Sequence, residues 1–135
     1  MADKQFDLKI ITPTGDQFEG PVTSVTCPGT IGSFQVLYNH APLLASLDIG
    51  IMKFEAEGGT QYYAVSGGFA QVFHNNVLVL AETAERADEI DVERAKASKQ
   101  RAEERLSKER SQIDASRAEA SLHRAINRLK VAGSL

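Results

Sequence analysis

The sequence predicts a β + α fold with an N-terminal antiparallel β-sandwich of about ten strands, followed by a C-terminal antiparallel two-helix hairpin. Two contrasts in composition predict this division. All nine aromatic residues, all four prolines and nine of the ten glycines lie before residue 81, whereas twelve of the fifteen Lys and Arg residues lie between Ala81 and Leu135. The chain of 135 residues suffices for one small domain with an appendage. We place the sandwich at residues 1–86 and the hairpin at residues 87–135.

The first part consists of short apolar runs separated by turn-forming residues. Phe6 to Ile10 and Val22 to Val25 are interpreted as strands with one buried and one solvated face. Closely spaced strands without a helical pattern between them favour a sandwich or barrel over an alternating α/β fold. The glycine-containing segments at 29–33 and 66–69 match neither a phosphate loop nor a nucleophile elbow. We interpret both as turns.

The second part has the composition of helices. It contains eleven alanines from Ala81 onward and no proline. Asp91 is the expected N-cap of a helix that runs to about Ser107, and Asp114 is the expected N-cap of a second helix that runs to about Val131. The short connection at 108–113 favours an antiparallel hairpin.

The seam of the predicted hairpin contains few large apolar side chains. Burying five or six Val, Leu and Ile side chains contributes at most ~1.5–3 kcal/mol each, whereas ordering some 45 residues costs on the order of 1.5 kcal/mol apiece before hydrogen bonds are counted. The hairpin should therefore be marginal alone. It must dock on the sandwich, bind a partner or be able to open.

Composition excludes several classes of protein. A formal net charge of −3 does not favour nucleic acid as a partner. The longest apolar stretch, Val77 to Ala81, is far shorter than the ~20 residues of a membrane helix, so no direct membrane insertion is expected. The single cysteine, Cys27, fits a reducing compartment and a buried position in a strand. The default location is cytoplasmic.

The sequence offers no constellation typical of catalysis. The three histidines, His40, His74 and His123, stand far apart, with no partner at metal-ligand spacing and no nucleophile beside them. We therefore predict no catalytic residue and no metal site.

Four arginines of the helical part form the most informative cluster. Arg94 and Arg101 share one face of the first helix, Arg124 and Arg128 share one face of the second, and an antiparallel hairpin brings Arg94 near Arg128 and Arg101 near Arg124. Guanidinium groups suit phosphate, and Asp91 could accept a hydrogen bond from a ribose hydroxyl or an adenine amine. The alternative is a solvated face with ion pairs within each helix.

Two motifs in the first part carry a family resemblance. The segment from Pro28 to Leu43 reads PGTIGSFQVLYNHAPL, and SGGFAQV at 66–72 is followed by NNV at 75–77. In this order they resemble the epsilon subunit of the bacterial-type rotary ATP synthase. The resemblance spans essentially the whole chain. It implies the same sandwich and hairpin, a subunit without a catalytic site, and a place at the foot of the central stalk, on the cytoplasmic face of the plasma membrane.

The resemblance also implies partners. The sandwich would contact the gamma subunit and the membrane ring of c subunits, with Gly29, Thr30, Ile31 and Gly32 facing the ring. The segment His40, Ala41 and Pro42 would lie near gamma.

For the helical part, the resemblance implies regulation. The compact hairpin permits rotation in both directions, and the extended hairpin reaches the alpha and beta subunits and suppresses ATP hydrolysis. The segment IDVERA at 90–95 is similar to the ATP-binding motif of Bacillus-type members, so ATP is the expected regulatory ligand. A role for Mg²⁺ stays open, and the resemblance implies no required cofactor. The implied ATP-binding residues are Glu85, Ile90, Asp91, Arg94, Ala95, Arg101, Arg124 and Arg128.

Two other functions remain open at this point. In the first, the chain is a free-standing ATP-sensing module, with the sandwich as its scaffold. In the second, the helices form an intermolecular coiled coil, and the chain is an adaptor whose dimer depends on Leu122, Ile126 and Leu129. Co-purification with a membrane ATPase separates the stalk function from both.

Overall fold

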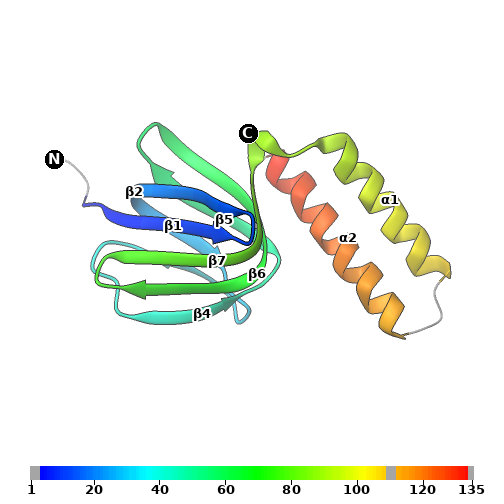
Figure 1. Ribbon diagram of the computed structural model, residues 1–135, viewed down its shortest axis with the longest axis horizontal. Helices are drawn as coiled ribbons and strands as arrows, with labels where there is room; N and C mark the ends of the chain where they lie inside the picture. Colours follow the sequence, from blue (N-terminus) through cyan, green and yellow to red (C-terminus); the bar gives the residue numbers. More distant parts are fainter. Residues whose placement is uncertain (1–3, 109–111, 134–135) are drawn as a thin grey trace.

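The structure, a computed structural model, describes residues 4–108 and 112–133 and consists of a β-sandwich with a helical hairpin beside it (Figure 1). The first strand begins at the end of the sandwich that is far from the helices (Figure 1). The second helix, α2 (Gln112–Ala132), lies between the sandwich and the first helix, α1 (Val92–Lys108) (Figure 1). The elements in chain order are β1 (Phe6–Thr12), β2 (Gly15–Pro28), β3 (Ser33–Val36), β4 (Leu43–Leu47), β5 (Gly50–Ala56), β6 (Gly59–Phe73), β7 (Asn76–Arg86), η1 (Ala87–Glu89), α1 (Val92–Lys108) and α2 (Gln112–Ala132).

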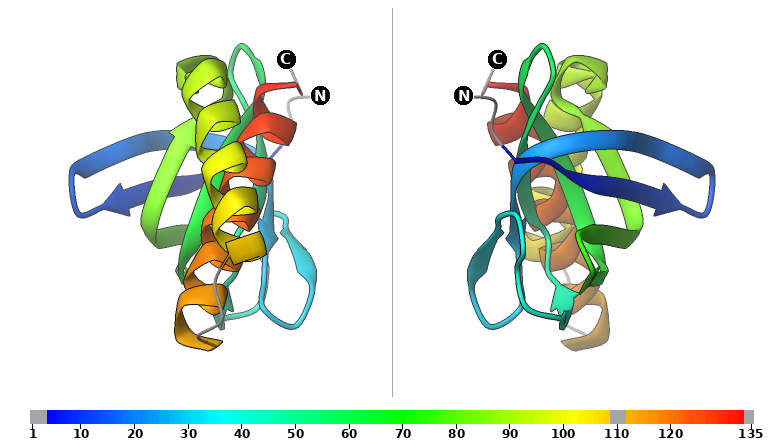
Figure 2. Two further views of the ribbon diagram at one scale, coloured as in Figure 1. Left: turned by 90° about the vertical axis from the view of Figure 1, so that its right-hand side faces the viewer. Right: turned by 90° about the vertical axis from the view of Figure 1, so that its left-hand side faces the viewer.

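The seven strands form one curled sheet, which closes on itself where β1 meets β2 (Figure 2). The order is β1-β7-β6-β5-β2-β3, β1 also pairs with β2, and β4 pairs with β6. All these pairings are antiparallel except that of β1 with β7, which is parallel. The architecture is the predicted sandwich followed by two helices, with one parallel pair that the sequence analysis did not expect.

The strands are fewer and longer than the predicted ten, because segments interpreted as breaks lie inside strands. The segment Ser66 to Phe69 is not a turn but part of β6, which has 15 residues. Gly67 and Gly68 have positive φ values of 66° and 121° within it. Glycine tolerates these angles, so the pair can bend the strand and leave its pairing with β7 in register on both sides.

Alternation along the strands builds the core. From Phe6 to Ile10, buried and more accessible side chains alternate as predicted. Val22 and Val25 are both fully buried although they are three residues apart. The pairing of β2 with β5 shifts register between Val22 and Ser24, so a bulge restores the inward direction of the second valine.

Cys27 is fully buried in the core of the sandwich, as expected. Burial raises the pKa of its thiol from 9.0 to about 12. Between these two pH values the unfolded chain releases the thiol proton and the folded chain keeps it. The contribution of this thiol to the free energy of unfolding is therefore fully present below pH ~9 and is lost as pH rises, by up to about 1.4 kcal/mol per pH unit.

We therefore expect the free energy of unfolding, measured with urea at about pH 8 and about pH 10.5, to fall less steeply for Cys27→Ala than for the wild type. Burial also raises the pKa of Tyr63, which contributes to the alkaline loss in both proteins. Equal losses in the two proteins would show that the Cys27 thiol ionises in the folded chain.

One of the two helices begins at a different residue from the one predicted. Asp91 caps α1 as predicted, because its Oδ1 accepts a hydrogen bond of 3.0 Å from the backbone N–H of Arg94. Asp114 is not an N-cap: α2 already begins at Gln112, and the carboxylate lies in its first turn, where it still faces the positive end of the helix dipole. Of the predicted connection at 108–113, residues 109–111 lie outside the described residues, and the others belong to the two helices.

The hairpin docks through the C-terminal part of α2. Val131 is completely buried and belongs to a small cluster with Ala64, Ala87 and Ile90, onto which Ile51, Tyr62 and Ala132 pack. The opposite end of the hairpin points away from the sandwich (Figure 1). Ala95, Ala102, Ala118 and Ala125 are buried, which fits a seam of small side chains between the helices. No helix within the described residues is long and apolar enough to cross a bilayer.

Candidate functional site

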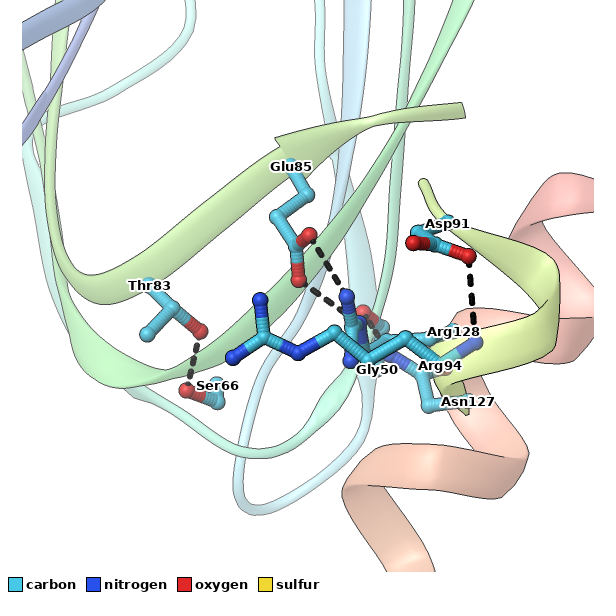
Figure 3. A network of polar contacts seen from close by, with 8 residues as sticks. All are labelled: Gly50, Ser66, Thr83, Glu85, Asp91, Arg94, Asn127 and Arg128. Carbon is cyan, nitrogen blue, oxygen red and sulfur yellow. Dashed lines mark hydrogen bonds and ion pairs between the residues drawn. The ribbon is translucent and has the colours of Figure 1, made fainter. Parts of the chain in front are cut away.

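The sandwich and α2 are joined by a polar contact between Glu85 and Arg128. Nη2 of Arg128 donates a hydrogen bond of 3.0 Å to Oε2 of Glu85, and Nε lies 2.8 Å from Oε1 (Figure 3). Nε is buried, and its N–H has no hydrogen bond of good geometry. The pair is partly shielded from water, with the Arg128 side chain 21% exposed, so the attraction exceeds that of an ordinary surface ion pair.

A cavity of about 290 Å³ lies beside this pair. The sandwich lines it with Glu85 and with Ser66 and Thr83, whose hydroxyl oxygens are 2.5 Å apart (Figure 3). The helices line it with Ser98, Ser121, Arg124, Asn127 and Arg128, among others. A ligand here would contact both parts of the chain.

A second cavity of about 190 Å³ adjoins the first, and the two share Ser98 and Ser121. Arg101 and Arg105, one turn apart on α1, line it. Arg101 donates to Ser98 and Arg124 donates to Ser121, at 3.1 and 3.2 Å. Since these bonds are to neutral hydroxyls, they leave both positive charges uncompensated. Across the two cavities four arginines face one glutamate, which favours an anionic ligand.

The remaining residues of the predicted ATP site have other positions. The backbone of Arg94 is bound to the capping Asp91, while its side chain points in the direction of Thr83 and Ser66 (Figure 3). Ile90 and Ala95 are buried, Ile90 in the docking cluster, and neither lines the two cavities. Asp91 does not line them either, and one of its oxygens is occupied by the cap.

Sequence reasoning missed several residues of this site. Asn127, Ser98, Ser121, Arg105 and the Ser66–Thr83 pair line the cavities but were not singled out. The signal that could have found the helical members is their spacing: Ser98, Arg101 and Arg105 recur at helical steps, as do Ser121, Arg124 and Arg128. Nothing in the sequence relates β6 and β7 to these helix faces. Among the described residues no group of His, Cys, Asp and Glu side chains could hold a metal ion.

The segment Gly29 to Gly32 forms an exposed loop outside this site. The Thr30 N–H donates to the Ser46 carbonyl at 3.0 Å, and the two hydroxyl groups are 2.7 Å apart, so the loop is tied to β4. A Cβ on Gly29 would lie 2.6 Å from the Gly32 carbonyl oxygen, which requires glycine there. Ile31 is fully exposed. An apolar side chain held out on an anchored loop is suited to a contact with another chain.

The segment His40, Ala41 and Pro42 lies between β3 and β4. Nδ1 of His40 lies 2.6 Å from the carbonyl oxygen of Ala41, and Ala41 and Pro42 are exposed. Leu44, two residues after Pro42, belongs to a group of exposed apolar side chains on the paired strands β4, β6 and β7. We call this surface the β4–β6–β7 face; it comprises Leu44, Phe69, Phe73 and Leu80.

The comparisons with known proteins agree with the architecture. The model of the ATP synthase delta/epsilon chain β-sandwich domain matches residues 5–87, and that of the delta/epsilon long α-helix domain matches residues 88–133. The chain is 56% identical over 133 residues to the ATP synthase epsilon chain of Pelotomaculum thermopropionicum, covering 98% of this chain and 99% of that one. It is 50% identical to that of Desulforamulus reducens, covering 93% and 95% of the two chains.

A solved structure adds support for the fold. A chain in the cryo-EM structure of the Euglena gracilis mitochondrial ATP synthase, comprising OSCP, F1 and c-ring, superposes with a TM-score of 0.82 at 24% identity, covering 100% of this chain and 85% of that one. With both family models matched in order and relatives of this identity along nearly its whole length, the chain belongs to the ATP synthase delta/epsilon chain family.

Proposed function

We propose that the chain is the epsilon-type subunit of a bacterial central stalk, and that its hairpin is an ATP-responsive inhibitor of ATP hydrolysis. As a member of this family it is a non-catalytic subunit of the rotary ATP synthase. The observation that carries the regulatory part is the pair of adjoining arginine-lined cavities, the larger of which has walls from both the sandwich and the helices.

Two surfaces of the sandwich support attachment to the rotor. Ile31 on its anchored loop would contact the c-ring, together with Gly29, Thr30 and Gly32. The β4–β6–β7 face and the neighbouring segment at 40–42 would contact gamma, because exposed apolar side chains on adjacent strands favour burial against a partner. This attachment would hold the chain at the cytoplasmic face of the plasma membrane.

ATP fits the chemistry of the cavities. Their combined volume lies within the about 300–1,000 Å³ of small-molecule sites. Arg101, Arg124 and Arg128 would hold the phosphates by charge-assisted hydrogen bonds, and Glu85 would orient the polar edge of the nucleoside. Arg94 and the second oxygen of Asp91 lie at the start of α1 and would complete the site from its rim.

The geometry makes such a ligand a regulator. Because Glu85 comes from β7 and the arginines come from the helices, ATP would bind the docked hairpin and not the undocked one. It would stabilise docking by ~1.4 kcal/mol at tenfold excess over Kd. When ATP falls, the hairpin would undock. The part of α2 from Arg117 onward, with four basic residues against one acid, would then contact acidic surfaces of the alpha and beta subunits.

Calorimetric titration of the full chain with ATP tests this function. We expect saturable one-to-one binding, weakened about a hundredfold or more in the Arg124→Ala, Arg128→Ala double variant, because each lost charge-assisted bond contributes about 1.5–3 kcal/mol. Titration with and without Mg²⁺ shows whether the metal takes part.

Arg117→Ala is the matched control for this titration, since Arg117 is exposed on the same helix and does not line the cavities. Absence of binding to the wild type at millimolar ATP would remove nucleotide sensing from this subunit and leave the arginines as a surface for a protein partner.

A further inference from the structure

Asn127 is a buried amide at the docking surface of the hairpin. It lies in α2, is 7% exposed, and donates a hydrogen bond of 2.8 Å from Nδ2 to the carbonyl oxygen of Gly50 (Figure 3). One turn further along α2, Val131 is completely buried in the small apolar docking cluster. An amide buried without a partner is destabilising, so this side chain favours the one docked arrangement in which its donor meets an acceptor.

The acceptor is held in place by the sandwich. Gly50 begins β5 and is paired with Val65 of β6. A Cβ on Gly50 would lie 2.4 Å from Cβ of Pro28, at the end of β2, so the Gly50 backbone sits closely against that proline. Three strands therefore determine where the Gly50 carbonyl lies, and α2 must adjust to it.

Asn127 lies next to the cavity-lining arginines on α2. Asn127 follows Arg124 by three residues and precedes Arg128, and all three line the first cavity. A shift of α2 by one residue would turn each side chain by about 100° around the helix axis. The apolar contacts alone offer little to prevent such a shift, because α2 contributes only Val131 and Ala132 to the docking cluster and two small side chains interlock weakly.

We propose that Asn127 is the positioning residue of the docked hairpin: its bond to Gly50 selects the rotation and height of α2 at which Arg124 and Arg128 face Glu85 and the cavity. The inference rests on the proposed function in one respect, namely that the hairpin docks and undocks. In this arrangement an uncharged hydrogen bond, together with the Glu85–Arg128 pair, fixes how α2 docks on the sandwich.

The docked population can be measured directly in the full chain. Spin labels on Glu57→Cys, in the exposed β5–β6 turn, and on Ser107→Cys, near the exposed end of α1, report the distance between sandwich and hairpin. Cys27 is fully buried and its pKa is raised to about 12, so it will not take up the label. The measurement is made without ligand and along an ATP titration.

Two substitutions test the hydrogen bond. Asn127→Leu removes the donor and keeps the volume, and we expect the ratio of docked to undocked chains to fall roughly tenfold and the ATP midpoint to rise. Asn127→Asp introduces a carboxyl that donates to the Gly50 carbonyl only when protonated, so docking should be weak at neutral pH and recover in acid. His123→Gln, on an exposed position of α2, is the matched control.

Glu85, Arg124 and Arg128 are the charged residues that line the same cavity, and Glu85 is a second carboxyl there. The leucine variant, which carries no titrating group at this position, is therefore followed over the same pH range. Acid recovery of the aspartate variant to a docked fraction above that of the leucine variant supports the role of the hydrogen bond. Neutralising a buried charge would by itself restore docking only to the level of a side chain without a donor.

Gly50→Ala tests the bond from the other side. It displaces the acceptor, so combined with Asn127→Leu it should add little to the loss of docking. A leucine variant whose docked fraction equals that of the wild type at every ATP concentration overturns the proposal. A wild type that docks without ATP and does not respond to ATP would instead overturn the nucleotide part of the proposed function and leave this assignment intact.

Discussion

Replacing Gly68 by alanine is expected to prevent the sandwich from folding stably. A Cβ at this position would lie 2.0 Å from the carbonyl oxygen of Leu80 and 2.8 Å from Cα of Ala81. Both atoms belong to the backbone of β7, which cannot move away without breaking its pairing with β6. The φ value of 121° adds backbone strain for any residue with a side chain. Strain and overpacking together should lower the free energy of unfolding by about 4 kcal/mol.

Urea unfolding followed by far-UV circular dichroism measures this loss, which approaches the lower limit of the about 5–15 kcal/mol total stability typical of a domain. Gly20→Ala is the matched control, since its Cβ would meet nothing closer than the Phe18 ring at 3.4 Å and its φ is not positive. We expect the control to stay within about 0.5 kcal/mol of the wild type. Equal midpoints for the two variants would mean that β6 and β7 separate easily at this bend.

Ending the chain after Asp88 is expected to abolish inhibition of ATP hydrolysis and its response to ATP. Such a chain retains β1 to β7 and the whole main core, whose buried cluster contains no residue of the helices. It loses the arginines of both cavities and exposes Ala64 and Tyr62. The sandwich should therefore fold, with a loss of about 1–3 kcal/mol from the docking cluster.

Hydrolysis by an ATP synthase reconstituted with the shortened chain measures the effect. We expect a rate at low ATP severalfold above that obtained with the full chain. Raising ATP should narrow this difference, because ATP relieves the inhibition only where the helices are present. Co-sedimentation of the shortened chain with the assembly is the control, because attachment through the sandwich should persist. A shortened chain that is attached and inhibits as strongly as the full one would assign the inhibition to the sandwich.

Local rules predicted much of the sandwich correctly, and the errors occurred where pairing overrides local signals. The alternation from Phe6 to Ile10 follows from residue type alone. The glycines at 67 and 68 have the composition of a turn, yet the pairing of β6 with β7 on both sides keeps the strand continuous. The parallel pairing of β1 with β7 joins segments some 70 residues apart, which no short-range pattern indicates.

In the candidate site, too, local patterns predicted some features and the fold decided the others. Helical spacing was enough to gather the arginines into two pairs on two helices. The pairing of Arg128 with Glu85 depends on how α2 docks, and a separation of 43 residues conceals it in the sequence. Asn127 looks like any polar helix residue until the fold places it against Gly50.

Composition, period and motif order are local properties of a chain, so they were enough to predict the two-part architecture, the family and the cationic helix faces. Which faces meet depends on the folded chain. The docked position of α2 depends on a backbone carbonyl of β5, a carboxylate of β7 and a few small apolar side chains, which are distant in the sequence. Such contacts form only when both parts are folded, so their geometry is a property of the whole chain.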